Sequence, residues 1–280
     1  MIPLVLVGAW GRMGLAVAAA AAAAPDLRVV ARSGEGDRLE IEEDETARRA
    51  SGYAQPGGPG TTGPAAVAED ALGRFLLRGD VVIDFSSPEG LRRAAHACAA
   101  GGAALVSGTT GLGPEDLRLL EEVAARVPVL VAANFSLGLV ALRRAVGAAL
   151  EMLPASWDIE IIERHHRRKV DSPSGTALAL AREASRLRGL DAEALRHGRS
   201  GRAGPRPEGE IGIHAVRGGT WVGDHAVLLA GDGESLELRH IVEDRAAFAH
   251  GALAAARFVA RAKPGRYALD DVLEARGRPG

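Results

Sequence analysis

Cysteine is almost absent from this sequence, in which Cys98 is the only one among 280 residues. A single thiol excludes an intrachain disulfide and any zinc site built from cysteines. Cys98 lies within an apolar helical pattern, LRRAAHACAAG, so we expect it to be a small buried hydrophobic residue and not a reactive thiol.

The sequence also lacks a long apolar run and a strong charge of either sign. Residues 16–24 are apolar but fall well short of the roughly 20 residues that a membrane-spanning helix needs. Residues 2–7 lack the basic leader of a signal peptide. The net charge of −2 gives no reason to expect a nucleic acid or an anionic membrane as partner. We therefore expect a cytoplasmic protein with no nucleic-acid and no membrane partner.

The first 31 residues have the pattern that opens a dinucleotide-binding domain. Residues 2–7 are uniformly apolar, as in a strand buried on both faces of a parallel sheet. A glycine turn, an alanine-rich helical run to residue 24 and a second strand at 27–31 follow. A strand, a glycine turn, a helix and a strand within about 30 residues form the βαβ unit that binds dinucleotides.

The glycines of this turn read G-x-x-G-x-x-G, because Trp10 stands at the usual middle glycine position. Gly8 suits the tight turn, Gly11 allows the backbone to approach a pyrophosphate closely, and Gly14 allows the helix to pack on the strand. A glycine pattern alone is weak evidence in a chain with 36 glycines. Its place between a buried strand and a helix makes it informative.

The end of the second strand is where the type of cofactor is usually read. Arg32 and Ser33 suit the 2′-phosphate of NADPH, whereas Glu35 could hold the bare ribose of NADH if the loop bends back. Ordinary loop polarity explains each of these residues equally well. We expect NADPH as the cofactor, with NADH also accepted.

A charged stretch at 35–50 and a Gly/Pro/Thr-rich stretch at 51–64 indicate a surface excursion, after which strands and helices alternate again. Small polar turns follow three of these strands, at Phe85-Ser86-Ser87, Gly108-Thr109-Thr110 and Asn134-Phe135-Ser136. Ligands of doubly wound sheets bind outside the carboxyl ends of the strands. The three turns therefore predict a cleft.

From residue 157 the pattern changes to strands at 158–163, 211–217, 225–230 and 235–242 with one helix at 173–188. The fold class that we predict is α/β, with an N-terminal Rossmann-like doubly wound parallel sheet and a second α+β domain that has a mixed or antiparallel sheet. The predicted domains are a dinucleotide-binding domain at 1–135, a substrate-binding domain at 136–245, and a C-terminal segment at 246–280 that packs back on the first.

The densest group of basic and titratable residues lies within WDIEIIERHHRRKVDSPSGTALALA, at 157–181. A strand leads into six such residues at 164–169, and Pro173-Ser174-Gly175-Thr176 then begins a helix. Cations beside a helix N-terminus favour an anion site, although a charge run is more often a solvated loop. Lys169 favours the site, because only two of the 34 basic residues are lysines and an ammonium, unlike a guanidinium, can lose its proton.

Several segments together resemble the 4-hydroxy-tetrahydrodipicolinate reductase (dihydrodipicolinate reductase) family. The longest is ERHHRRKVDSPSGTA at 163–177. The others, in the family's order, are GAWGRMG at 8–14, GTTG at 108–111, ANFS at 133–136, RGG at 217–219 and VGDH at 222–225. The long segment is very specific, and the shorter ones would be weak alone.

This resemblance implies an enzyme that reduces a cyclic dicarboxylate substrate with NADPH or NADH in the diaminopimelate branch of lysine biosynthesis. It implies that His165 is the acid/base group, that Lys169 donates a proton, that His166 contacts the substrate, and that Gly175 and Thr176 bind a substrate carboxylate. It also implies a homotetramer assembled through the second domain. We expect no metal site.

The family's cofactor contacts correspond to three segments of this chain. The predicted cofactor-binding residues, with Arg32 added from the second strand, are Gly8, Ala9, Trp10, Gly11, Arg12, Met13, Gly108, Thr109, Thr110, Ala132, Ala133, Asn134 and Phe135. Trp10, and the lack of a clear acidic residue near Arg32, depart from the family's pattern and concern the choice of cofactor, not the chemistry.

The chemistry of the residues agrees with these roles. Hydride addition to a conjugated imine leaves electron density that needs a proton from a positioned acid. A histidine, with an unperturbed pKa near 6.5, can donate and recover a proton near neutral pH. We expect the neighbouring arginines to disfavour the charged form of Lys169.

Two other functions stay open on the residues alone. One is a related NAD(P)-dependent amino-acid dehydrogenase or imine reductase, and the other is a non-catalytic dinucleotide-binding sensor of an anionic effector. A zinc site at His165 and His166 is disfavoured, because adjacent histidines on regular structure point apart and no thiol or acidic partner is suitably spaced.

Overall fold

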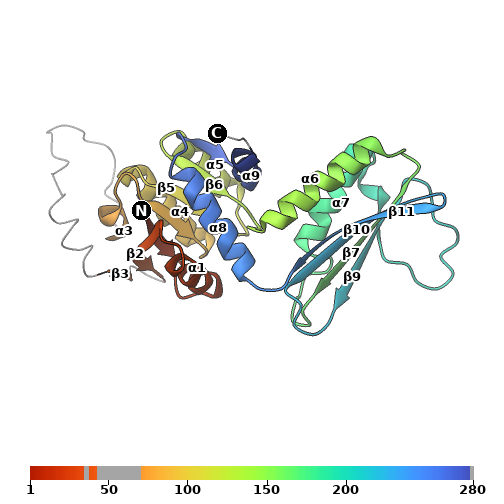
Figure 1. Cartoon of the computed structure of the whole chain (residues 1–280), viewed down its shortest axis with the longest axis horizontal. Helices are drawn as coiled ribbons and strands as arrows, with labels where there is room; N and C mark the ends of the chain where they lie inside the picture. The colour runs from red at the N-terminus through yellow and green to blue at the C-terminus, as the bar shows by residue number, and fades with distance from the viewer. Residues whose placement is uncertain (35–37, 43–70, 278–280) are drawn as a thin grey trace. The chain divides into compact units, whose positions relative to one another are not determined.

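The computed structural model describes residues 1–34, 38–42 and 71–277 of the chain (Figure 1). These residues form two compact units. The first comprises residues 1–135 together with the C-terminal segment from 248, and the second comprises residues 136–247. Glu35 and most of the predicted surface excursion at 35–64 lie outside the described residues.

The first unit contains a seven-stranded sheet in the order β12-β6-β5-β4-β1-β2-β3. Its strands are β1 (Ile2–Val7), β2 (Leu27–Ser33), β3 (Leu39–Ile41), β4 (Val81–Asp84), β5 (Ala104–Ser107), β6 (Pro128–Val131) and β12 (Gly265–Tyr267). All neighbouring strands are parallel except β2 and β3. The strand order reverses direction at β1, so the gap between β1 and β4 is the switch point at which such sheets bind ligands.

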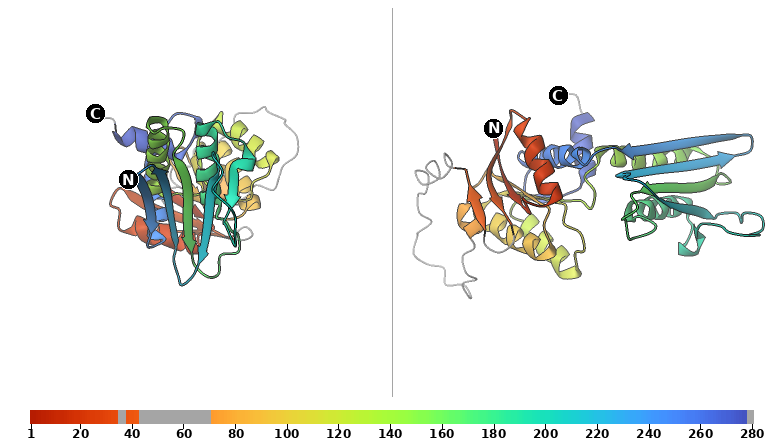
Figure 2. Two further views of the ribbon diagram at one scale, coloured as in Figure 1. Left: turned by 90° about the vertical axis from the view of Figure 1, so that its right-hand side faces the viewer. Right: turned by 90° about the horizontal axis from the view of Figure 1, so that it is seen from below.

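Helices cover both faces of this sheet (Figure 2). They are α1 (Arg12–Ala22), α3 (Ala71–Phe75), α4 (Pro88–Gly101), α5 (Pro114–Ala124), α8 (Ala246–Val259) and α9 (Leu269–Gly277). The helix starts have local causes. Proline occupies the first turn of α4 and α5, and the Ser87 hydroxyl accepts a hydrogen bond from the Gly90 N–H at 3.2 Å. Cys98 on α4 is fully buried in the core, as predicted, and burial raises the pKa of its thiol.

The ends of the second strand differ from the sequence prediction. Strand β2 continues to Ser33, two residues beyond the predicted end, because its last residues pair with β1 on one side and with β3 on the other. Arg32 is therefore inside a strand, where it pairs in register with Glu40. The short strands β3 and β12 were not predicted.

The second unit contains a mixed five-stranded sheet in the order β11-β10-β7-β9-β8. Its elements are α6 (Leu137–Met152), β7 (Asp158–His165), α7 (Gly175–Arg188), a 3₁₀ turn η1 (Ala192–Ala194), β8 (Leu195–His197), β9 (Ile211–Arg217), β10 (Gly223–Gly231) and β11 (Glu234–Val242). β7 runs parallel to β9 and antiparallel to β10. Helices α6 and α7 pack on one face of the sheet (Figure 2), around a core that includes Val146, Leu180, Ile161 and Leu229.

The alternation along β7 explains how the sheet orients its side chains. Ile159, Ile161, Glu163 and His165 are buried, and the residues between them are only partly buried. Two apolar residues and two polar residues therefore point to the same side. In the described part of the chain, no helix has both the length and the apolar character that crossing a membrane requires.

Candidate active site

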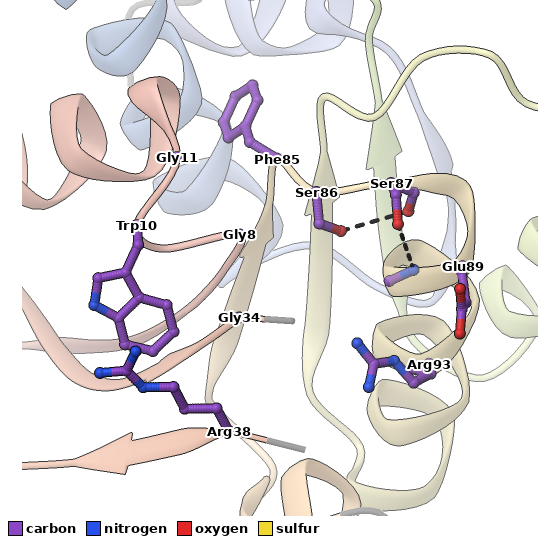
Figure 3. A pocket seen from close by; sticks show the side chains of 11 residues that line it. Gly8, Trp10, Gly11, Gly34, Arg38, Phe85, Ser86, Ser87, Glu89 and Arg93 are labelled. Atoms are coloured by element: carbon purple, nitrogen blue, oxygen red, sulfur yellow. Dashed lines mark hydrogen bonds between the residues drawn. The ribbon is translucent and has the colours of Figure 1, made fainter. Parts of the chain in front are cut away.

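A cavity of about 770 Å³ lies in the first unit at the switch point of the sheet (Figure 3). It is lined by the turn after β1 and by the turn after β4, including Gly8, Trp10, Gly11, Phe85 and Ser86. Helix α1 starts at this turn, with Gly11 as its N-cap. Its first turn carries no acidic side chain that would repel an anion. Unpaired N–H groups at a helix start favour an anion such as a pyrophosphate.

The three glycines of the first turn are required for different reasons. Gly8 has φ +73°, and a Cβ on it would lie 2.4 Å from the carbonyl oxygen of Phe85. A Cβ on Gly14 would lie 2.3 Å from the carbonyl oxygen of Gly8, so the helix could not pack as closely on the turn. Gly11 lines the cavity, where a bare backbone leaves room for a ligand. The turn between β1 and α1 thus has the close backbone packing of a dinucleotide-binding glycine turn.

Trp10 and Arg38 form one wall of this cavity (Figure 3). The Arg38 guanidinium lies 4.1 Å from the centre of the Trp10 ring, a cation–π contact. Arg38 also pairs with Glu40 and keeps 60% of its side chain exposed. Arg32 is not among the residues that line the cavity, and its guanidinium lies 3.6 Å from the Glu42 carboxylate. The sequence-based prediction missed Arg38.

The turns after β4 and β5 are joined by one buried carboxyl group, Asp84. It accepts hydrogen bonds from the hydroxyls of Ser107 and Thr109, each at 2.7 Å, and from Ser86. Burial raises the pKa of Asp84 more than these hydroxyls lower it. The neighbouring Phe85 ring lies against Gly108, on which a Cβ would be 2.1 Å from the ring.

The third predicted turn lies against the same group of side chains. The ring of Phe135 meets the ring of Phe85 edge-on at 5.4 Å, and the Ala132 N–H donates to the Ser107 carbonyl at 3.0 Å. The predicted cofactor residues Ala9, Gly108, Thr109, Ala132 and Phe135 are buried or half-buried here. Arg12 and Thr110 are exposed, as is Ala133, while Met13 and Asn134 are half-buried.

The second unit brings the residues of the basic segment to the end of β7. His165 is the last residue of the strand and is only 8% exposed. Burial lowers the pKa of His165, and the positive charges of Lys169 and Arg217 lower it further, while Glu163 opposes them. The ring of His225, on β10, meets the His165 ring edge-on at 5.1 Å. Burial, and then His165, lower the pKa of His225 to about 4, so this ring is neutral at pH 7.

The six basic or titratable residues at 164–169 point in different directions, because two of them end β7 and the other four lie in the loop that follows. Arg167 and Arg168 are exposed, and Arg164 points to the other side of the strand and lies 3.3 Å from the Asp224 carboxylate. The Lys169 N–H donates to the His166 carbonyl at 3.0 Å, which turns the loop back. The structure therefore does not gather the whole cluster around one anion.

Lys169 and His166 differ in their partners. The Lys169 ammonium lies 2.9 Å from the Asp171 carboxylate, an acceptor that the sequence-based argument did not count. Nδ1 of His166 is buried and has no hydrogen-bond partner within the described residues. A buried nitrogen without a partner is costly.

Helix α7 begins at Gly175, two residues after the predicted start, with Ser174 as its N-cap. The Ser174 hydroxyl accepts from the Ala177 N–H at 3.1 Å and lies 3.1 Å from Nε2 of His225. Gly175 is exposed, and a Cβ on it would meet no atom within 4 Å. The helix start is therefore open on the side where a Gly175 side chain would lie.

Four residues around His165 were not assigned a role from the sequence: Glu163, Ser174, Arg217 and His225. The signal that could have revealed Glu163 is its position, because an acidic residue at an inward-facing place in a strand calls for buried partners. The described residues contain no group of three or more His, Cys, Asp or Glu side chains that could hold a metal ion.

Comparisons with known proteins match both units. The family model described as dihydrodipicolinate reductase, N-terminus, matches residues 2–135, and the model for the C-terminus of the same enzyme matches residues 138–273. The chain is 40% identical to 4-hydroxy-tetrahydrodipicolinate reductase of Caulobacter vibrioides over 97% of each chain. It is 44% identical to the enzyme of that name from Thermomicrobium roseum, over 98% of this chain and 100% of the relative.

A solved structure supports the fold. The dipicolinate-bound dihydrodipicolinate reductase from Paenisporosarcina sp. TG-14 aligns with a TM-score of 0.71 at 24% identity, over 97% of this chain and 99% of that one. Both halves of the chain match one family in order and over nearly the full length of its relatives, as the resemblance of residues 163–177 predicted. The chain belongs to the dihydrodipicolinate reductase family.

Proposed function

We propose that this chain reduces 4-hydroxy-tetrahydrodipicolinate to tetrahydrodipicolinate in the diaminopimelate route to lysine, with a nicotinamide cofactor as the reductant. Its relatives along the full length carry the name of this reductase. The observation that carries the proposal is local: His165 at the end of β7, Lys169 in the loop that follows and the start of α7 lie in one continuous segment. Water is lost from the substrate, one hydride and one proton are added, and the oxidised cofactor is released.

The first unit is the proposed cofactor-binding domain. The turn after β1 and the start of α1 would hold the pyrophosphate, because they offer N–H groups and glycines without an acidic side chain. The turns after β4, β5 and β6, organised by Asp84, would contact the rest of the dinucleotide. When bound, the reduced nicotinamide supplies the hydride.

The second unit, 136–247, is the proposed substrate-binding domain. The N–H groups of Gly175 and Thr176 and the ammonium of Lys169 would meet the two substrate carboxylates. His166 would contact the substrate, as the family resemblance implies. His165 and Lys169 would supply the protons: one goes to the hydroxyl that leaves as water and one to the ring that accepts the hydride, while the loss of water returns one proton from the ring, so that one proton is consumed in all.

The proposed function predicts oxidation of NADPH or NADH that depends on the substrate. The purified protein should oxidise either cofactor, followed at 340 nm, only when 4-hydroxy-tetrahydrodipicolinate is generated in the cuvette by a coupling enzyme. Omitting the coupling enzyme is the control. No oxidation with this substrate, but turnover of an amino acid, would favour the dehydrogenase alternative, and cofactor binding without turnover of either would favour the sensor.

We also propose that both cofactors are accepted, with NADPH preferred through Arg38. A 2′-phosphate needs a cation at the wall of the cavity, and Arg38 lines that wall beside Trp10. Arg32, the residue first expected in this role, is close to Glu42 and does not line the cavity.

An Arg38→Ala variant should raise KM for NADPH about 10-fold and leave KM for NADH within about 2-fold. A hydrogen bond to a charged group contributes roughly 1.5–3 kcal/mol, and the lower end applies because the Arg38 side chain is 60% exposed to solvent. Arg32→Ala is the matched control, and both variants are measured with each cofactor. A selective loss of NADPH in the Arg32 variant alone would return the role to Arg32.

The assembly and the location of the protein complete the proposal. A homotetramer formed through the second unit is what the family resemblance implies, and the edge strand β11 carries exposed Leu236 and Ile241 side chains that such an assembly would cover. We place the reaction in the cytoplasm, where reduced nicotinamide cofactors are maintained.

A further inference from the structure

Glu163 is an acidic residue in a position where the strand pattern expects an apolar one. It lies on β7 between Ile161 and His165 on the inward face and is 0% exposed. An ionised carboxylate without compensating partners would be very costly at such a place.

Both oxygens of this carboxylate are fully engaged. Oε1 accepts from Nη2 of Arg217 at 2.7 Å and from the N–H of Ser174 at 2.9 Å. Oε2 accepts from Nη1 of Arg217 at 2.6 Å and from Nδ1 of His165 at 2.7 Å. Burial raises the pKa of Glu163, but the hydrogen bonds from Arg217, His165 and Ser174 outweigh it and lower the pKa, so the group is ionised at neutral pH.

The ionised carboxylate determines which nitrogen of His165 can react. A carboxylate only accepts hydrogen bonds, so Nδ1 must carry a hydrogen and Nε2 is the atom that gains or loses a proton. Within the described residues, Nε2 has no hydrogen-bond partner. A Cβ on Gly223 would lie 3.3 Å from Nε2, so the absence of a side chain there leaves space beside this atom.

The other oxygen connects the same carboxylate to helix α7. Ser174, whose N–H it binds, is the N-cap of this helix and is 2% exposed. Arg217 strengthens the connection, because its Nη2 also donates to the Asp171 carbonyl at 2.7 Å. The loop between β7 and α7 is therefore held at both ends by Glu163 and Arg217.

We propose that Glu163 is a positioning residue for the reductase reaction, which sets the tautomer of His165 and holds the start of α7 against it. The proposal rests on the proposed function. The proton leaves Nε2 for the substrate, and the imidazole becomes neutral. The Nδ1 hydrogen stays on the imidazole and keeps its hydrogen bond to Glu163. The hydride, with its electron pair, comes from the reduced nicotinamide. Glu163 itself exchanges no proton and touches no substrate.

The test is a Glu163→Gln variant, which keeps the shape of the side chain and removes its charge. We expect kcat to fall about 10-fold and KM for the substrate to rise, because both His165 and the start of α7 lose their anchor, while KM for the cofactor stays unchanged. An amide can donate as well as accept, so it no longer specifies the Nδ1 hydrogen of His165.

The pH profile separates this role from a merely structural one. The groups that face His165 are Glu163 on its own strand, Lys169 in the following loop, Arg217 on β9 and His225 on β10. Glu163 alone among them raises the pKa of His165, so its loss must lower that pKa further. Activity that needs protonated His165 should therefore decline at lower pH in the variant than in the wild type.

A double-mutant cycle with His165→Gln gives a second readout. If Glu163 acts through His165, adding Glu163→Gln to the His165→Gln variant should change kcat by less than about 2-fold. A further 10-fold loss in the double variant would mean that Glu163 affects turnover independently of His165 and would overturn the proposed tautomer role.

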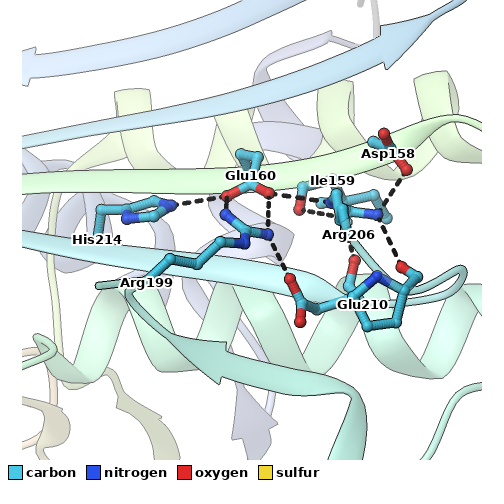
Figure 4. A network of polar contacts seen from close by, with 8 residues as sticks. Asp158, Ile159, Glu160, Arg199, Arg206, Glu210 and His214 are labelled. Carbon is cyan, nitrogen blue, oxygen red and sulfur yellow. Dashed lines mark hydrogen bonds and ion pairs between the residues drawn. The ribbon is translucent and has the colours of Figure 1, made fainter. Parts of the chain in front are cut away.

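Glu160 supplies the matched control (Figure 4). It lies on the same strand three residues earlier, but on the other face, and accepts hydrogen bonds from Arg199, Arg206 and His214. Glu160→Gln should leave kcat and the pH profile unchanged, even if it lowers the melting temperature.

The outcomes separate the two proposals. An active wild type with a Glu163→Gln variant of unchanged kcat and pH profile overturns the positioning role alone, whereas an inactive wild type overturns the function and this role with it. If Glu163→Gln does not fold, Glu163→Asp keeps the charge and is expected to lower kcat without moving the pH profile. A profile that moves in Glu163→Asp as well would contradict the role of the charge.

Discussion

A Lys169→Ala variant is expected to turn over the substrate about 10²-fold more slowly than the wild type, with KM for the cofactor unchanged. Loss of a positioned proton donor typically costs 10²–10⁴-fold in rate. Lys169 is half-buried in the loop after β7, and among the described residues its ammonium pairs with the Asp171 carboxylate. Lys169 is not among the residues that line the cavity of the first unit, so we expect cofactor binding to be unchanged.

Lys169→Arg distinguishes proton donation from charge. A guanidinium keeps the positive charge but does not give up a proton near neutral pH. If Lys169 donates a proton, Lys169→Arg should be as slow as Lys169→Ala in a steady-state assay at saturating cofactor. If the arginine variant recovers most of the activity, Lys169 acts only by attracting the substrate carboxylates.

A His165→Gln variant is also expected to lower kcat by about 10²-fold, since it removes the proposed acid/base group. The variant should also lose one feature of the wild-type pH profile, the decline in activity that deprotonation of His165 causes. In the wild type, activity that requires protonated His165 is present below the pKa of this group and is lost as the pH rises through it. Burial lowers this pKa, so the loss should occur at a lower pH than for an ordinary histidine, and the variant should lack this limb.

The control for His165 is His197→Gln, an exposed histidine on β8. It should leave the rate and the pH profile unchanged. Wild-type rates in both His165→Gln and Lys169→Ala would remove the proton-transfer roles assigned to these two residues.

The parts of the fold that could be predicted from the sequence are those with a long or periodic signal. The apolar strand β1, the glycine turn and α1 were predicted as a nucleotide-binding βαβ unit, and β9 was predicted over its whole length. The three-residue strands β3, β8 and β12 were not. Such short segments have no measurable periodicity, and they become strands only because a longer neighbour offers its free edge.

The end of β2, where the type of cofactor is recognised, could not be predicted from the sequence either. Nothing in Arg32 or Ser33 indicates a strand, and β2 continues through both residues because they pair with β1 on one side and with β3 on the other. Arg38 lines the cavity beside Trp10, whereas Arg32 does not. The residue proposed to contact the 2′-phosphate could not be chosen before the lining of this cavity was known.

The sequence by itself determined the family, the two kinds of sheet, and the segment in which His165, His166, Lys169, Gly175 and Thr176 lie, because these residues are neighbours along the chain. Only the tertiary structure decided how that segment is held. Glu163, Arg217 and His225 come from three different strands, and their hydrogen bonds depend on the register of β7 with β9 and β10. A pattern along one chain reports which residues are close in sequence, whereas a buried carboxylate must find its donors in space, wherever the fold provides them.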